Sequence, residues 1–311
     1  MTNKDRLQTL LDGGVPDIPP HWELVFQIPE ALFGMDPAAV EEKPYVTEAD
    51  RQAARIAFHN EVAWRLIEDL GWAAVPAWNP YDAEVVRLAK RVFDGRALSP
   101  GYEGGGVFYM PNGSDMLDFA VRLHERPEDL RQEARRKCDA AKETLRRLAD
   151  AGADFFVLTY DFGYNAAPFV SPKHFAWLVA PYLSEIVEQA HDLGKRAILH
   201  SDGCLSRILD QIHATGVDGY QSVDPQGGMD IGVVREAYPD WLLMGNVPCN
   251  LLQDVEEEPI REAVRTCMAL GGVGKRYVLS TSNCIFHGMP PESYRIMLDE
   301  YHRLTSARVE G

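Results

Sequence analysis

The chain has 311 residues, of which 46% are hydrophobic and 25% charged, a composition typical of a globular protein with a sizeable core. The formal net charge is −16 and the pI is about 5.0, and no cluster of Lys or Arg reverses this field, so nucleic acid and anionic membranes are not expected partners. The five cysteines are widely spaced, and no apolar run approaches the length of a membrane span. We therefore expect a soluble cytoplasmic protein with reduced thiols.

The first half of the chain contains fewer clear strands than the second. Apolar, β-rich runs predict strands at 18–26 and 72–78, and a long amphipathic pattern between them predicts a helix over 48–71. The segment 84–112 combines alternating charges with the glycine-rich stretch GYEGGGVFYMP, which we interpret as a small hairpin inserted before a third strand. A further helix is predicted from about 127 to 151.

The second half alternates strand-like and helix-like segments with great regularity. Strands are predicted at 153–161, 195–200, 217–223, 241–247 and 276–283. Helices are predicted at 172–194, 204–216, 229–239, 256–272 and 290–304. Strands separated by such helices pair in parallel through right-handed crossovers, and their number approaches eight. We therefore predict an α/β fold, a (β/α)8 barrel built as a single domain over residues 1–311.

In a barrel of this kind the chemistry lies on the loops that follow the strands. The sequence places many polar or thiol side chains at these strand ends. They are Glu23, Gln27, Asn79, Tyr160, Asp161, Tyr164, His200, Asp202, Cys204, Ser222, Asp224, Asn246, Cys249, Ser282, Asn283 and Cys284.

The stretch AILHSDGCLSRIL, residues 197–209, contains the densest group of these candidates. His200 and Asp202 point the same way if the strand extends that far, because side chains at i and i+2 of a strand share a face. Catalytic zinc usually takes three ligands from His, Cys and carboxylate, and Cys284 is the natural third. The SDG stretch is equally good turn chemistry, with Asp202 as a helix cap. Asp161 is similarly compatible with a catalytic acid or with a polar cap.

The motifs HSDG, GNV and TSNCIFHGMPPESY, together with the stretch from PFVSPKHF to LLMGNV, resemble the uroporphyrinogen decarboxylase superfamily. This group of TIM barrels also contains the methyltransferases of corrinoid-dependent systems. The resemblance covers roughly residues 110 to 305. It implies the barrel fold and a homodimer, and it leaves two main reactions to consider.

The decarboxylase branch binds a tetrapyrrole with many carboxylates and carries several arginines in its N-terminal segment. Here no arginine lies between Arg6 and Arg51, where the chain reads IPPHWELVFQIPE. The sequence also differs near Asn283, where the decarboxylases have a histidine. Binding of a polyanion without cationic partners is unfavourable, because its carboxylates lose their hydration and gain no replacement. Decarboxylation of a tetrapyrrole or smaller carboxylate is therefore kept as the alternative function, ahead of a non-catalytic paralogue.

The methyltransferase branch holds zinc with a His-x-Cys pair and a distant Cys. His200 matches the histidine and Cys284 the distant cysteine, whereas Asp202 stands where the first cysteine would be. A carboxylate is also a zinc ligand and carries the charge of a thiolate. The resemblance thus implies zinc at His200, Asp202 and Cys284.

We therefore predict a methyltransferase that moves a methyl group between a small-molecule donor or thiol acceptor and a corrinoid. The corrinoid is expected as free methylcobalamin or on a partner corrinoid protein. Asp161, Tyr160 and Asp202 are the predicted catalytic residues, acting in substrate orientation or proton transfer. The predicted substrate-binding residues are Glu23, Tyr164, Asp224, Asn246 and Asn283.

Overall fold

The computed structural model describes residues 1–93, 95–272 and 274–309. Within these residues six parallel strands form one sheet in the order β1-β2-β3-β4-β5-β6. The strands are β1 (Gly101–Glu103), β2 (Phe156–Thr159), β3 (Ala197–His200), β4 (Gly219–Ser222), β5 (Leu242–Val247) and β6 (Tyr277–Thr281). Because all six strands run parallel, their carboxyl ends meet at the same edge of the sheet.

Two short N-terminal segments close this sheet into a ring. His21 forms a parallel bridge with Leu279 of β6, and Ala74 forms one with Leu98, just before β1. The backbone N–H of Ala73 donates to the carbonyl of His21 at 2.9 Å, which joins the two segments to each other. The segments around His21 and Ala74 thus add two positions to the ring, and the predicted α/β barrel class is confirmed.

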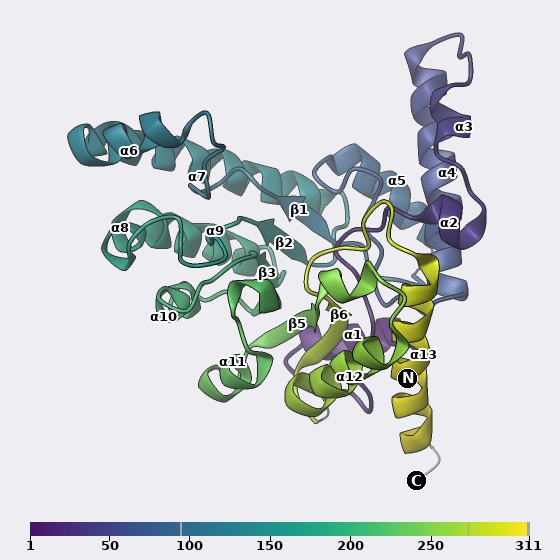
Figure 1. Cartoon of the computed structure of the whole chain (residues 1–311). Coiled ribbons are helices and arrows are strands. Elements are labelled where there is room, and N and C mark those ends of the chain that lie inside the picture. The colour runs from purple at the N-terminus through teal and green to yellow at the C-terminus, as the bar shows by residue number, and fades with distance from the viewer. Residues whose placement is uncertain (94, 273, 310–311) are drawn as a thin grey trace.

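Helices follow the successive positions of the ring and surround it (Figure 1). The longer ones are α4 (Glu48–Glu68), α5 (Ala83–Phe93), α7 (Pro127–Asp150), α9 (Ala180–Asp192), α12 (Glu257–Cys267) and α13 (Pro291–Val309). The shorter ones are α1 (Asn3–Leu11), α2 (Pro29–Phe33), α3 (Ala38–Glu41), α6 (Met116–Glu125), α8 (Pro172–Leu178), α10 (Leu209–His213) and α11 (Ile231–Ala237). Single helical turns lie at Pro225–Gly227, Cys249–Leu252 and Met268–Gly272. No helix among the described residues is long and apolar enough to cross a bilayer.

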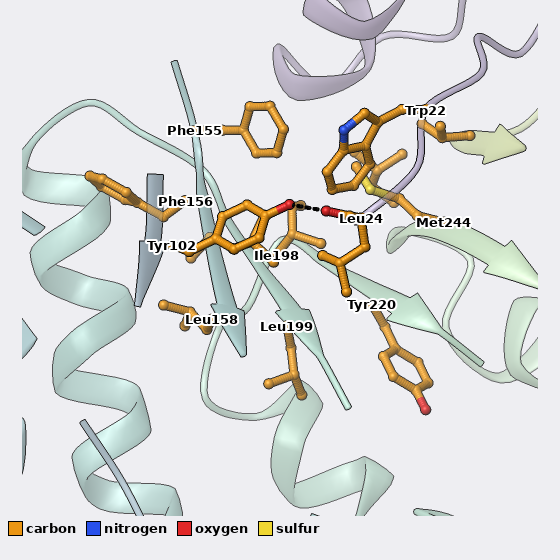
Figure 2. Close-up of a cluster of buried hydrophobic side chains, with 14 of the residues drawn as sticks. Trp22, Leu24, Tyr102, Phe155, Phe156, Leu158, Ile198, Leu199, Tyr220 and Met244 are labelled. Carbon is orange, nitrogen blue, oxygen red and sulfur yellow. Dashed lines mark hydrogen bonds between the residues drawn. The ribbon is translucent and has the colours of Figure 1, made fainter. Parts of the chain in front are cut away.

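Side chains from the strands and from the first closing segment fill the inside of the barrel (Figure 2). Trp22 and Ile198 are fully buried there, and Phe156 and Leu199 are fully buried on the opposite face of β2 and β3, toward the helices. Burial of one such side chain contributes about 1.5–3 kcal/mol. Tyr102 of β1 donates a hydrogen bond to the carbonyl of Leu24 at 2.6 Å, so even this polar tip is satisfied inside the core.

The prediction of a hairpin within 84–112 is wrong. This part of the chain forms helix α5 and then β1, which pairs in parallel with β2. The side chains of Val85, Val86, Ala89 and Phe93 are buried on one side of α5, at helical spacing. The alternation of charges in this segment is thus the exposed face of an amphipathic helix.

The segments 18–26 and 72–78 form isolated bridges instead of the predicted continuous strands. Pro19, Pro20 and Pro76 lie in them and have no N–H to donate to a ladder. The helix predicted over 172–194 is likewise divided at Val179, between α8 and α9.

Candidate functional site

Two neighbouring strands bring three potential metal ligands together at the carboxyl edge of the sheet. Asp161 follows β2, and His200 and Asp202 lie at and just beyond the end of β3. Nε2 of His200 is 3.8 Å from Oδ1 of Asp161 and 4.0 Å from Oδ2 of Asp202. One ligand atom from each residue lies within 4.8 Å of the others, so the three could hold a metal ion. We call Asp161, His200 and Asp202 the carboxylate–histidine cluster.

The orientation of the His200 ring is set by Gln221 of β4. The side-chain nitrogen of Gln221 donates to the carbonyl of Thr281 at 3.4 Å, which leaves its oxygen facing Nδ1 of His200. An amide oxygen only accepts, so Nδ1 carries the hydrogen. In the neutral ring the lone pair therefore lies on Nε2, which faces two carboxylates. Such a convergence of electron pairs is suited to binding a metal ion.

Asp202 is held by its own set of donors. Ser222 donates to Oδ1 at 2.7 Å, and the side-chain amide of Asn283 donates to Oδ2. The backbone N–H of Asp202 donates to Oδ1 of Asp161 at 3.1 Å. Burial raises the pKa of Asp202, while His200 and the bond from Ser222 act in the opposite direction. Asp202 is thus a fixed carboxylate rather than a helix cap.

Ser222 makes its bond to Asp202 from an unusual backbone conformation. Its φ is 101° and that of Val223 is 48°, values that residues with a Cβ rarely adopt. Strain of this kind costs of order 1–3 kcal/mol and persists where the surrounding structure enforces it. Its position beside Asp202 identifies the end of β4 as part of the site.

The cluster lies in the wall of an open cavity of about 760 Å³. We call it the mouth cavity. It is lined by Leu24, Val25, Tyr81, Tyr102, Glu103, Gly104, Gly105, Tyr109, Thr144, Arg147, Thr159, Asp161, His200, Asp202 and Asn283. Three of these side chains are carboxylates, and one, Arg147, is a permanent cation. The volume is ample for a small-molecule substrate.

Tyr160, a predicted catalytic residue, lies outside the lining of the mouth cavity. Its side chain is fully buried, and its hydroxyl donates to Glu103. Glu103 also accepts bonds from the N–H groups of Gly105 and Gly106, at 2.9 and 3.1 Å. Burial is the main reason that the pKa of Tyr160 is raised. Tyr160 therefore holds the loop after β1 in place.

Glu23, a predicted substrate-binding residue, is buried and accepts hydrogen bonds from Thr281 of β6. The backbone N–H and the hydroxyl of Thr281 reach one of its carboxyl oxygens at 2.9 and 2.7 Å. Burial raises the pKa of Glu23 to about 8, and nearby His21, also buried, has its pKa lowered to about 3. Both side chains are therefore uncharged near pH 7, as expected for groups buried in the interior.

Cys284, predicted as the third zinc ligand, lies outside the carboxylate–histidine cluster. Its carbonyl accepts a bond from the Cys249 thiol at 3.6 Å. Burial raises the pKa of the Cys284 thiol to about 12, with further contributions from the neighbouring Cys249, Glu23 and Asp202. Asp161, and not Cys284, is thus the third potential ligand beside His200 and Asp202.

The remaining predicted substrate-binding residues differ in their positions. Asn283 lines the mouth cavity. Asp224 is tied to its own loops, because it accepts bonds from the N–H groups of Gly203 and Gln226 at 3.0 and 2.9 Å. Asn246 donates to the carbonyl of Val223 at 2.8 Å. Tyr164 is 38% exposed and is not among the residues that line the mouth cavity.

Sequence reasoning missed Gln221, Glu103 and Thr159. Gln221 and Thr159 flank His200 in register, on β4 and β2. A polar side chain within a short apolar strand is the available signal, and GYQS and FVLT both carry it. Alternation along the strand points such a side chain to one face with its partner on the neighbouring strand.

Comparisons with known proteins place this site in a family. A family model described as uroporphyrinogen decarboxylase (URO-D) matches residues 84–304. No curated protein shows a significant sequence match. The fold is similar to that of a methyltransferase from Methanosarcina mazei, with a TM-score of 0.74 and 17% identity over 98% of this chain and 99% of that one.

Two further solved structures share the fold less closely. A sugar phosphate isomerase/epimerase from Parabacteroides distasonis gives a TM-score of 0.51 at 10% identity, over 94% of this chain and 98% of that chain. A B12-independent methionine synthase from Shewanella sp. W3-18-1 gives 0.50 at 10% identity, over 72% and 67%. At these identities the likenesses show the fold alone. The family model, in contrast, spans well over half of the sequence, and the chain therefore belongs to the uroporphyrinogen decarboxylase family.

Proposed function

We propose that this protein is a methyltransferase that moves a methyl group between a small methyl donor or thiol acceptor and a corrinoid, either free or carried by a partner protein. The observation that carries the proposal is the convergence of Asp161, His200 and Asp202 on one point of an open cavity at the barrel mouth. The likeness in fold to a methyltransferase from Methanosarcina mazei supports the same choice within the family.

The cluster fits a divalent metal ion, with zinc as the first candidate. A neutral histidine and two carboxylates balance the charge of such an ion, and the lone pair of Nε2 of His200 faces the two carboxylates. When bound, the ion supplies Lewis-acid polarisation of the heteroatom that carries or accepts the methyl group. Oxygen-rich ligands also suit harder ions, so the metal content itself is part of the test.

The chain's own residues orient the reacting groups. Ser222 and Asn283 fix the carboxylate of Asp202, and Gln221 fixes the ring of His200. Asp161, whose side chain is 42% exposed, is the member of the cluster most open to the mouth cavity. It is placed to contact a substrate and to accept or return a proton.

The charges that line the mouth cavity disfavour a tetrapyrrole bearing many carboxylates. Arg147 is the permanent cation in the lining, and it lies among Glu103, Asp161 and Asp202. Most carboxylates of such a substrate would lose their hydration without a cation to replace it. Methyl transfer to or from a corrinoid makes no such demand on the lining.

The experiment that tests the function follows the cobalt spectrum. Purified protein, reconstituted with Zn²⁺, is mixed with reduced cob(I)alamin and candidate methyl donors, or with methylcobalamin and candidate thiols. We expect protein-dependent conversion between the two cobalt spectra, lost in His200→Ala and retained in His124→Ala, which removes an exposed histidine on α6. Turnover of uroporphyrinogen, with no change in either cobalt spectrum, would contradict the proposal.

A further inference from the structure

Three cavities lie in a row on one side of the barrel, and the mouth cavity forms one end of the row. The middle cavity, of about 180 Å³, shares four lining residues with the mouth cavity, namely Leu24, Val25, Tyr81 and Tyr102. The outer cavity, of about 430 Å³, shares four others with the middle cavity, namely Phe26, His59, Val62 and Trp78. It is bounded by α2, α3 and α4, which lie together at one side of the ring (Figure 1). The three cavities are therefore neighbours along a line that leads to the carboxylate–histidine cluster.

The middle cavity is lined by uncharged side chains. The indole N–H of Trp72 in its wall donates to the hydroxyl of Tyr294 at 3.0 Å, and Tyr102 donates to the carbonyl of Leu24 at 2.6 Å. Burial lowers the pKa of His59 to about 4, so this ring is neutral near pH 7. A charged molecule would lose its hydration in the middle cavity without compensation. The middle cavity thus favours small uncharged molecules.

Trp78 lies between the outer and middle cavities, and Arg55 of α4 holds it there. The guanidinium of Arg55 is 5.7 Å from the centroid of the Trp78 ring, and its Nε donates to Glu41 of α3 at 2.6 Å. The side chain of Glu41 is 47% exposed, so the outer cavity opens to solvent. Pro76 and Pro80 restrict the backbone on either side of Trp78. Rotation of the Trp78 side chain is therefore the movement that connects the two cavities.

Tyr81 lies at the other end of the middle cavity, beside the carboxylate–histidine cluster. Its ring packs edge to face on that of Tyr102, with centroids 5.7 Å apart, and both rings line the middle cavity and the mouth cavity. The hydroxyl of Tyr81 is 3.1 Å from the hydroxyl of Thr159, which lines the mouth cavity. Thr159 is paired in register with His200 on the adjacent strand. A molecule that leaves the middle cavity past Tyr81 thus arrives next to His200.

The proposed reaction requires two molecules of very different size to meet at the cluster. Direct transfer of a methyl group requires the reacting atoms to lie about 3–3.5 Å apart. The cluster lies in the wall of the mouth cavity, and a corrinoid is a macrocycle much larger than its small reaction partner. A corrinoid that brings its cobalt this close therefore covers the mouth, and the small partner then needs another route.

We infer that the outer and middle cavities form a side entrance, through which a small uncharged reactant or product passes while the corrinoid covers the mouth. Trp78 is the gate of this entrance, and Arg55 is the residue that keeps the gate closed. A water molecule takes up about 30 Å³ in the liquid, so the middle cavity has room for a molecule of several heavy atoms. The need for a second route rests on the proposed function, whereas the route itself rests on the cavities alone.

The route is tested by the labelling of cysteines introduced along it. The probes are methyl methanethiosulfonate, which is small and uncharged, and its trimethylammonium-ethyl analogue, which is a cation. Ala63→Cys and Ala77→Cys each place a thiol in the lining of the middle cavity, and Ala57→Cys places one on the exposed face of α4. Peptide mass spectrometry distinguishes these thiols from the five native cysteines. We expect the uncharged reagent to label all three variants and the cation to label Ala57→Cys at least tenfold faster than the other two. Equal labelling of all three by the cation would contradict the selection of uncharged molecules.

The gate is tested by changing Trp78 and Arg55 in the Ala63→Cys background. Trp78 is 37% exposed, so Trp78→Ala removes the gate at little cost to the core and should speed labelling by the uncharged reagent at least fivefold. Arg55→Gln keeps the gate but removes the cation that holds it, and should give a smaller acceleration. The control is Trp64→Ala, which removes a tryptophan that stacks with Arg96 and is not among the lining residues of the three cavities. Equal labelling rates with Trp78→Ala and Trp64→Ala would overturn the side entrance.

Methylcobalamin separates the failure of the side entrance from the failure of the proposed function. With methylcobalamin in excess, labelling of Thr159→Cys in the mouth cavity should slow at least tenfold, while labelling of Ala63→Cys should change less than twofold. Equal protection of both thiols would overturn the side entrance and leave the proposed function standing. If Thr159→Cys is not protected but Trp78→Ala still speeds labelling of Ala63→Cys, the route stands and the corrinoid reaction falls.

Discussion

Nδ1 of His200 donates to the side-chain oxygen of Gln221, and this single bond determines which nitrogen faces the two carboxylates of the cluster. Outer partners of this kind typically change metal affinity 10–100-fold when they are removed. Gln221→Met should therefore weaken Zn²⁺ binding by about that factor, whereas Gln221→Glu, which still accepts from Nδ1, should retain most of it. Equilibrium dialysis measures both. Gln211→Met on α10, away from the cluster, is the matched control.

The structure and the sequence resemblance differ in the third residue that they suggest as a metal ligand. The structure suggests Asp161, and the resemblance implies Cys284. We expect Asp161→Asn and His200→Ala to lose bound zinc, because each removes a member of the cluster. Cys284→Ser should keep it, since its thiol lies outside the cluster. Metal analysis after reconstitution gives the stoichiometry. Loss of zinc from Cys284→Ser with retention by Asp161→Asn would restore the ligand set predicted from the resemblance.

Glu23 gives the folded protein a defined dependence on pH. Its pKa is raised from 4.5 to about 8, so the folded state holds a proton that the unfolded state releases between these values. The contribution of Glu23 to the free energy of unfolding is therefore fully present below pH 4.5. It is lost as pH rises toward 8, with a slope of about 1.4 kcal/mol per pH unit. Urea unfolding should show a loss of about 2 kcal/mol between pH 6.5 and 8 from this group.

The variant Glu23→Gln tests this assignment because it cannot ionise. It should remove most of the decline between pH 6.5 and 8, while Glu236→Gln, an exposed change on α11, should leave it intact. His21 acts on the opposite side, since its pKa is lowered from 6.5 to about 3 and stability is lost as pH falls through that range. An unaltered alkaline slope in Glu23→Gln would show that another group causes it.

The positive φ of Ser222 reverses the usual ranking of two substitutions. Glycine in a strand is normally less stable than alanine by about 0.5–1 kcal/mol. At Ser222, with φ of 101°, both variants lose the bond to Asp202 but only glycine relieves the backbone. Ser222→Gly should thus be more stable than Ser222→Ala by about 1 kcal/mol in denaturant unfolding. The pair Ser280→Gly and Ser280→Ala, on β6, should follow the normal order.

The strands and helices of the second half were predictable because their periods are distinct. Each strand there is a short apolar run between two helical patterns, and β2 to β6 lie within the predicted ranges. The first half was harder, because α5 alternates charged and apolar residues over a length that a hairpin also fits. Prolines, in turn, reduce the segments around His21 and Ala74 to single bridges, which apolar composition alone does not reveal.

Within the site, spacing along one strand was enough for His200 and Asp202, which the i, i+2 rule places on one face. The third member depends on which strands are adjacent. Asp161 follows β2, the direct neighbour of β3, whereas Cys284 follows β6 and lies beside Cys249. The order of the strands along the chain can be predicted from the sequence. Which side chain lies near Nε2 of His200 depends on how the strand ends pack, and this packing cannot be predicted from the sequence alone.

The segments around His21 and Ala74 are joined to their neighbours by few backbone hydrogen bonds, so we expect this side of the barrel to open more easily than the rest. Amides in β2 to β6 belong to continuous ladders, whereas those near His21 and Ala74 are joined by isolated bridges. Local opening free energies follow such differences, so hydrogen exchange should be fastest along this seam. Leu24 and Val75, which line the middle cavity of about 180 Å³ beside the mouth cavity, come from the two segments that form the seam. This side of the barrel can therefore open locally while the strands that carry the carboxylate–histidine cluster stay fixed.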